Sequence, residues 1–243
     1  MLMKSPNKLI ISLCTSILLA CTAQAETVEV KLVPDLDSFT VMHQGKPVKI
    51  IRNQNQKNVV DLSWARTSRK CPPFCPQPIH VAPGVTTVGE VEVFDFMQNK
   101  VNKGTGLIID ARVEEWHKKG TIPSSVNIPF TAFEMKASDP NLEAVMKKIG
   151  AKKRTDVGFM SRAWDSTVKA MGNDPQRTGF WDFTTSPDLL FWCNGPWCGQ
   201  SPHAIHGLLE LGFPPEKIYY YRGGMQMWEI LGLPVIVPED EEK

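Results

Sequence analysis

The sequence predicts an α/β fold built on a mainly parallel central sheet, and two observations indicate it. Three short apolar runs, at 107–110, 189–192 and 218–221, have almost no polar face, which is typical of strands covered on both sides. Segments with helical spacing of apolar residues lie between and after these runs, so strands alternate with helices. We therefore expect right-handed crossovers between parallel strands.

The first 25 residues are expected to form a secretory signal peptide. Lys4 and Lys8 precede an apolar stretch, and Ala23-Gln24-Ala25 offers the small residues of a cleavage site. The apolar stretch is short for a membrane span, so we expect an exported, periplasmic protein. Residues 18–21 also resemble a bacterial lipobox. The alternative is therefore a lipid anchor on Cys21 that tethers the protein to a membrane facing the periplasm.

Charge and composition give no sign of a polyanionic partner. The chain has 27 basic and 26 acidic side chains, and cleavage of the signal peptide would remove Lys4 and Lys8. The basic residues between Lys147 and Arg154 are interpreted as a solvated helix end, so we expect no nucleic-acid partner. No cofactor is indicated. The length suits one domain with an added segment.

Residues 26–86 are predicted to be a small β extension followed by a connector. Residues 39–51 alternate loosely around a turn at 43–46, which predicts a β-hairpin. The segment 71–78, Cys-Pro-Pro-Phe-Cys-Pro-Gln-Pro, is rich in proline and must be irregular. A hairpin of this size does not fold alone, so we expect it to pack on the main domain.

The main domain is expected over residues 87–237. Thr87 to Glu90 reads as a capping box that opens a helix with Val91, Phe94, Phe96 and Met97 as its apolar positions. Further elements are expected in this order: strand 107–110, helix 114–119, strand 126–129 and helix 142–149.

The second half of the domain starts after a less regular stretch. Residues 151–188 are predicted to be a largely loop-like insertion around a short helix that contains Trp164. Strand 189–192 then leads through a loop to a helix with Ser201 as its N-cap, which ends at Gly212. Strand 218–221, a turn at Gly223-Gly224 and helix 225–231 complete the domain. An acidic, disordered tail is expected at 238–243.

The loop at 193–201 is the candidate active site. Cys193 follows an apolar strand directly, and a helix begins at the other end of the loop. Backbone N–H groups and the positive end of the helix dipole would stabilise a thiolate or persulfide there. We therefore predict Cys193 as the catalytic nucleophile. The anion-binding or persulfide-binding loop is expected to consist of Asn194, Gly195, Trp197, Gly199, Gln200 and Ser201.

Three ordered motifs resemble the rhodanese-like domain family. They are Ile108 to Arg112 followed by Gly120 to Pro129, then the cysteine loop, then Tyr221 to Trp228 with its Gly-Gly pair. The resemblance implies a three-layer rhodanese-like domain and a sulfurtransferase. In such an enzyme Cys193 would take sulfur from a small donor, thiosulfate or a persulfide, and pass it to a thiol or to cyanide.

The loop departs from the family pattern in ways that bear on its chemistry. It is two residues longer than the common loop, and Gly199 and Gln200 stand where a basic residue is usual. Arg222 is a candidate substrate contact that would compensate, and Arg112 is a second candidate. A phosphatase of this fold would need arginine in a C-x5-R loop, but the count from Cys193 reaches Gly199.

The other cysteines leave several interpretations open. Cys198 is a candidate resolving thiol, which would make the loop a thiol-disulfide redox device with Cys193; inert packing and direct attack by Cys198 are the alternatives. Cys71 and Cys75 are expected to form a structural disulfide. A zinc site of all four cysteines, or a connector that exchanges disulfides with Cys193, is also conceivable, but no metal is predicted. A non-catalytic binding module is the remaining functional alternative.

Overall fold

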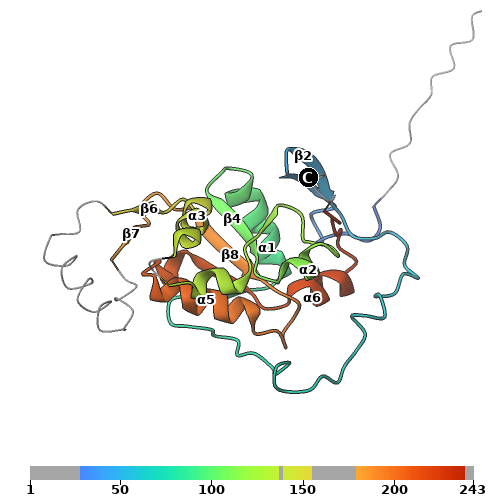
Figure 1. Ribbon diagram of the computed structural model, residues 1–243. Helices are drawn as coiled ribbons and strands as arrows, with labels where there is room; N and C mark the ends of the chain where they lie inside the picture. Colours follow the sequence, from blue (N-terminus) through green and yellow to red (C-terminus); the bar gives the residue numbers. More distant parts are fainter. Residues whose placement is uncertain (1–27, 137–138, 155–178, 239–243) are drawn as a thin grey trace, which may run out of the picture.

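The computed structural model describes residues 28–136, 139–154 and 179–238, and its centre is a five-stranded sheet (Figure 1). All neighbouring strands are parallel, in the order β3-β9-β8-β4-β5. The strands are β3 (Thr86–Val88), β4 (Gly106–Asp110), β5 (Ser125–Asn127), β8 (Asp188–Trp192) and β9 (Ile218–Tyr221). The predicted α/β class with a mainly parallel sheet is confirmed.

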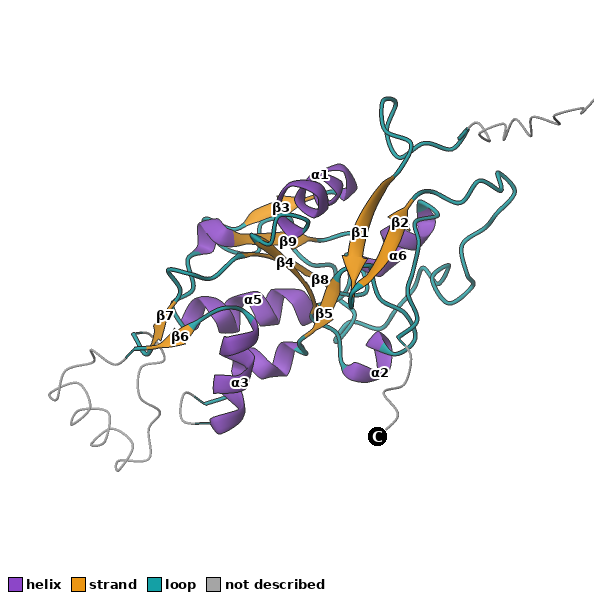
Figure 2. Cartoon of the chain, turned by 90° about the horizontal axis from the view of Figure 1, so that it is seen from above, coloured by secondary structure: helices purple, strands orange, loops and turns teal. Residues whose placement is uncertain are grey.

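Helices cover both faces of this sheet and give three layers. Figure 2 shows α1 on one side, with α3 and α5 on the other. The bounds are α1 (Glu90–Phe96), the π-helix η1 (Met97–Val101), α2 (Glu114–His117), the 3-10 helix η2 (Phe130–Glu134), α3 (Pro140–Lys148), α5 (Gln200–Glu210), the 3-10 helix η3 (Pro215–Lys217) and α6 (Gly224–Ile230).

Alternation along the strands explains the two layers of core. In β8, Leu189 and Phe191 pack in the cluster beneath α3 and α5, whereas Leu190 and Trp192 pack in the cluster beneath α1 and α6. Successive side chains of a strand point to opposite faces, so a wholly apolar run is needed where both faces are covered. The apolar runs that predicted buried strands therefore correspond to central strands of the sheet.

The N-terminal hairpin packs on the α6 side of the domain. Strands β1 (Phe39–His43) and β2 (Lys46–Ile50) pair antiparallel, as predicted. Ser124 fixes the end of β1, because its hydroxyl donates to the Met42 carbonyl and its N–H donates to His43 Nδ1. Val41 and Ile50 are buried in the same cluster as α1. The hairpin thus adds to the main core.

Two helix starts differ from the sequence prediction. Thr87 does not cap a helix: residues 86–88 form the edge strand β3, and Gly89 is the N-cap of α1. Glu92 accepts the Gly89 N–H at 2.9 Å, so the capping carboxylate lies two residues later than expected. In α5 the N-cap is Gly199, and Ser201 is buried inside the first turn. Parallel pairing with β9 outweighs the local capping signal of Thr87.

The insertion after α3 contains a small element that the sequence did not indicate. Strands β6 (Lys152–Lys153) and β7 (Trp181–Asp182) pair antiparallel at its base. The predicted helix around Trp164, the signal peptide and the acidic tail from 239 lie outside the described residues. Among the helices that are described, none has both the length and the apolar character for a membrane span.

Candidate active site

The start of α6 fixes the backbone of the cysteine loop. Met225 N–H donates to the Cys193 carbonyl at 2.9 Å, and Gln226 N–H donates to the Asn194 carbonyl at 3.0 Å. Gly224 has φ +54°, and a Cβ there would lie 2.2 Å from the Cys193 carbonyl oxygen. Glycine is therefore required by close backbone contact at Gly224, the second residue of the Gly-Gly turn that the sequence predicted.

The two loop sulfurs occupy different environments. Cys193 is 2% exposed, and its Sγ lies 3.2 Å from the Cys198 carbonyl, to which its S–H donates. Burial raises the pKa of the Cys193 thiol well above its ordinary value. The loop thus encloses Cys193, and this burial disfavours its thiolate.

The pKa of Cys198 is lowered, in contrast to that of Cys193. Hydrogen bonding from the Cys193 side chain, helped by the backbone of Gln200 and Asn194, lowers the pKa of Cys198 to about 7. Asn194 Nδ2 adds a longer contact of 3.8 Å to its Sγ. A thiol before the first turn of a helix gains further from the helix dipole. The ionised form is therefore favoured more on Cys198 than on Cys193, although both residues are buried, at 5% and 2% exposed.

The proline-rich connector lies directly over the loop. Gln77 N–H donates to the Pro196 carbonyl at 2.8 Å. The Arg222 guanidinium donates to the Gln77 carbonyl from Nε at 3.1 Å and from Nη2 at 2.8 Å. The ring of Phe74 packs edge-on against Trp197, with 5.6 Å between centroids. The extension and the loop therefore form one structural unit.

Trp197 is held between two segments of the chain that lie far apart in the sequence. Its indole N–H donates to Gln226 Oε1 at 2.8 Å, and Gln226 Nε2 donates to the Trp64 carbonyl at 2.8 Å. The Arg69 guanidinium stacks on the Trp197 ring, 4.0 Å from its centroid. Cys198 and Arg69 also interact electrostatically. Arg69 therefore places a positive charge beside the cysteine loop, which has no basic side chain of its own.

The two arginines predicted as substrate contacts have structural roles here. Arg222 is tied to Gln77, as described above. Arg112 is 1% exposed, and its guanidinium donates to both Asp110 carboxylate oxygens and to the Gly120 carbonyl. It also stacks on the Trp192 ring at 4.4 Å. Since its charge is neutralised and enclosed in the core, this placement argues against contact with a substrate.

An aromatic hollow of about 390 Å³ opens over Cys198. Four rings contribute to its walls: Phe74, Trp116, Phe130 and Trp197. The other lining residues are Pro73, Asn194, Cys198, Gly199, Gln200 and His203. Of the predicted loop residues the structure thus brings Asn194, Trp197, Gly199 and Gln200 to this hollow, while Ser201 is buried. Gly195 lies in the turn, where its carbonyl accepts from Cys198 N–H.

The chain has a parallel sheet with a cysteine loop between the end of a strand and the start of a helix, and its sequence matches the profile of one protein family. The profile of the rhodanese-like domain matches residues 94–231, more than half of the chain. The chain belongs to the rhodanese-like domain family. Its loop cysteines thus lie within the matched part, whereas the hairpin and the connector precede it.

Several solved rhodanese-related structures are similar to this rhodanese-like protein. A human single-domain sulfurtransferase has 16% identity and a TM-score of 0.34, over 59% of this chain and 95% of the other. A rhodanese-related protein from Thermoplasma volcanium has 13% identity and a TM-score of 0.34, over 63% and 99%. A single-domain sulfurtransferase from Saccharomyces cerevisiae has 14% identity and a TM-score of 0.33, over 59% and 88%. No curated protein matches the chain.

The other two described cysteines of this rhodanese-like protein are paired in the connector. Cys71 and Cys75 form a disulfide, with 4.7 Å between their Cα atoms, whereas Cys193 and Cys198 are free thiols. Within the described residues no group of three or more His, Cys, Asp or Glu side chains is arranged to hold a metal ion.

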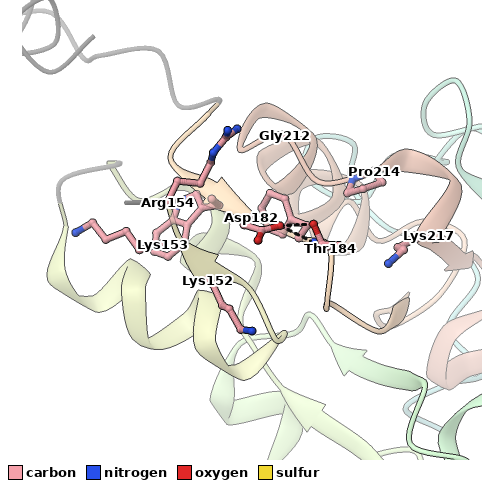
Figure 3. A pocket seen from close by; sticks show the side chains of 10 residues that line it. Lys152, Lys153, Arg154, Asp182, Thr184, Gly212, Pro214 and Lys217 are labelled. Carbon is pink, nitrogen blue, oxygen red and sulfur yellow. Dashed lines mark hydrogen bonds between the residues drawn. The ribbon is translucent and has the colours of Figure 1, made fainter. Parts of the chain in front are cut away.

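A larger hollow, of about 890 Å³, has no residue of the cysteine loop in its lining (Figure 3). It is found beside η3 and the β6-β7 pair, near the strand ends opposite the cysteine loop. Basic side chains line it, but Lys217 Nζ donates to the Ser186 carbonyl and Lys153 lies 3.7 Å from Glu143. Its lining residues include no nucleophilic thiol, so we place the chemistry at the cysteine loop.

Proposed function

We propose that this rhodanese-like protein is a sulfurtransferase in which Cys198 carries the sulfane sulfur as a persulfide. The observation that carries the proposal is the difference between the two thiols. Cys198 faces the hollow with a pKa of about 7, whereas Cys193 is enclosed and its pKa is raised. Because the thiolate is the nucleophile, Cys198 is the sulfur that attacks at neutral pH.

The reaction follows from this arrangement. The Cys198 thiolate attacks the outer sulfur of the donor, and the sulfur–sulfur bond of the donor breaks with its electron pair leaving on the donor fragment. With thiosulfate that fragment is sulfite, and Cys198 becomes a persulfide anion. A thiolate or cyanide acceptor then attacks the outer sulfur and releases the Cys198 thiolate. N–H groups of the loop and of the α5 start would stabilise the persulfide charge.

Cys193 has a supporting role in this scheme. Hydrogen bonding from its side chain is the largest effect that lowers the pKa of Cys198. We propose that it holds the thiolate in place rather than carrying sulfur itself. The persulfide on Cys193, as the sequence indicated, is the competing assignment.

Intact mass of the reduced protein after incubation with thiosulfate or methanethiosulfonate tests the proposal. We expect a gain of one sulfur atom that peptide mapping assigns to Cys198. The gain should disappear in Cys198→Ser and persist in Cys193→Ser. A sulfur mapped to Cys193 would overturn the assignment, and no sulfur on either cysteine with any donor would overturn sulfur transfer.

A redox function is the second candidate, because the two free cysteines lie in one loop and the Cys193 S–H donates to the Cys198 carbonyl at 3.2 Å. In that case an oxidant would remove two hydrogens from the pair to form a Cys193–Cys198 disulfide, and no sulfur would be gained. The same mass measurement distinguishes the two reactions. If the pair is inert to both donor and oxidant, the non-catalytic binding module is favoured.

We also propose that the protein acts in the periplasm after signal-peptide cleavage. The supporting observations are the leader-like residues 1–25 and the connector disulfide, which suits an oxidising compartment. Expression of the full chain in a bacterium tests this: the N-terminus of the periplasmic protein should be Glu26. A lipid on Cys21 in a membrane fraction would support the anchored alternative.

A further inference from the structure

The hollow over Cys198 has aromatic walls from four separate parts of the chain. Phe74 comes from the connector, Trp116 from α2, Phe130 from η2 and Trp197 from the cysteine loop. Neighbouring contacts hold these rings: Trp116 packs on Trp64 with 6.3 Å between centroids, and Phe130 packs on His203 at 6.0 Å. The rings are therefore fixed walls around the thiol.

Charge is scarce among the lining residues. They include no lysine or arginine, and His203 is their single basic side chain. Its Nδ1 lies 3.2 Å from Glu134 Oε1, so a carboxylate offsets any positive charge that it gains. Arg69 lines a neighbouring hollow that shares Phe74 and Trp197 with this one, and its charge acts on Cys198 from there. A small dianion would lose its hydration against the aromatic walls and would find no lysine or arginine in the lining itself to contact.

The size of the hollow suits an organic group. A volume of 390 Å³ lies within the range of about 300–1,000 Å³ that is typical of small-molecule sites. The amides of Asn194 and Gln200 are the uncharged polar side chains of the lining and lie beside the sulfur. A site with apolar walls and few polar groups near the nucleophile favours a ligand that has an apolar group and one polar, reactive end.

We propose that the donor for Cys198 is an organic sulfane-sulfur compound with an aromatic or similarly sized apolar group, such as an aryl persulfide or thiosulfonate. This inference rests on the proposed sulfurtransferase function. In the step, the Cys198 thiolate bonds to the outer sulfur of R–S–S⁻ and the sulfur–sulfur bond of the donor breaks. R–S⁻ leaves with the electron pair, and Cys198 keeps the outer sulfur as a persulfide anion. With a thiosulfonate R–SO₂–S⁻ the same attack breaks the corresponding sulfur–sulfur bond, and the sulfinate R–SO₂⁻ leaves with the electron pair.

Three donors test the inference: benzenethiosulfonate, methanethiosulfonate and thiosulfate. The first two are monoanions that both release a sulfinate, so they differ chiefly in the apolar group. For each donor we measure the second-order rate constant for persulfide formation on Cys198. This value is divided by the second-order rate constant of the same donor with a small thiol in water, which corrects for the intrinsic reactivity of the donor. We expect the corrected rate for benzenethiosulfonate to exceed that for methanethiosulfonate at least tenfold, with thiosulfate slowest.

Substitutions in the aromatic walls test whether these rings cause the preference for benzenethiosulfonate. Trp116→Ala should reduce the ratio of benzenethiosulfonate to methanethiosulfonate at least threefold, and Phe130→Leu gives a second test if Trp116→Ala folds poorly. Phe39→Ala is the matched control: this aromatic residue is also partly buried, but it packs on Phe94 and does not line the hollow. The ratio should stay unchanged in this variant.

The outcomes separate this inference from the function on which it rests. If every donor leaves both cysteines without sulfur, the sulfurtransferase proposal itself fails. If sulfur reaches Cys198 but the two thiosulfonates react equally, or thiosulfate reacts fastest, sulfur transfer stands and the organic donor is refuted. An unchanged ratio in both wall variants would also refute the role of the aromatic walls.

Discussion

Gly224→Ala gives a quantitative test of how the cysteine loop is held. At φ +54° an alanine residue costs about 1–2 kcal/mol because of its Cβ. That Cβ would also lie 2.2 Å from the Cys193 carbonyl oxygen and 2.8 Å from Gly195 N, so the backbone must move. Overpacking of this kind costs a further ~1–3 kcal/mol. The free energy of unfolding should therefore fall by about 2–5 kcal/mol in this variant.

Gly104→Ala is the matched control for this substitution. Gly104 has φ +72°, but nothing lies within 4 Å of a Cβ placed there, so it carries the backbone cost without the clash. Urea unfolding of both variants isolates the contact with the loop, and alkylation of Cys198 at pH 7 reports whether the loop has shifted. If both variants lose the same free energy of unfolding and Cys198 reacts as in the unsubstituted protein, the argument for a fixed loop is wrong.

Four further predictions follow from the ionisable groups of the loop and the core. The alkylation rate of Cys198 should rise with pH around a midpoint near 7, and Cys193→Ala should raise that midpoint toward 9.0, because a hydrogen-bond donor to the thiolate is lost. Folding lowers the pKa of Cys198, so its ionisation stabilises the folded state. This contribution to the free energy of unfolding should be complete above pH 9 and should be lost as the pH falls through 7. Urea titrations at several pH values should show this dependence, and Cys198→Ser should remove it. Arg69→Gln should raise the midpoint by less than about one pH unit, because the half-buried guanidinium acts on Cys198 through its charge, and Arg66→Gln serves as the neighbouring control. Asp110→Asn should lower the free energy of unfolding by about 3–5 kcal/mol because it leaves the buried Arg112 guanidinium uncompensated, and Asp37→Asn, in an exposed ion pair with Lys31, should change it little.

The sheet could be predicted from the sequence because its central strands are continuous apolar runs. Leu189 to Trp192 must be covered on both faces, and this alone indicates a three-layer arrangement. The edge strand β3 was missed because Thr86 to Val88 is short and also fits a helix cap. Its assignment depends on pairing with β9, which is far away in the sequence.

The cysteine loop could also be located from the sequence, but the difference in pKa between its two thiols could not. That difference depends on burial and on the groups that contact each sulfur in the folded chain, and local sequence does not determine these. One signal was present: Gly199 and Gln200 follow Cys198 directly and open the helix, so this cysteine stands closer to the helix start than Cys193 does. Arg69 could not have been assigned, because only the folded connector brings it to Trp197.

Hydrogen bonds around the cysteine loop join residues far apart along the chain. Gln226 reaches the Trp64 carbonyl across 162 positions, and Arg222 reaches the Gln77 carbonyl across 145. Contacts of such long range form late in folding, because a large loop must close first. The reactive thiol is therefore expected to be shielded only after the C-terminal helix has emerged and docked. Removal of either end of the domain should expose the same cysteine.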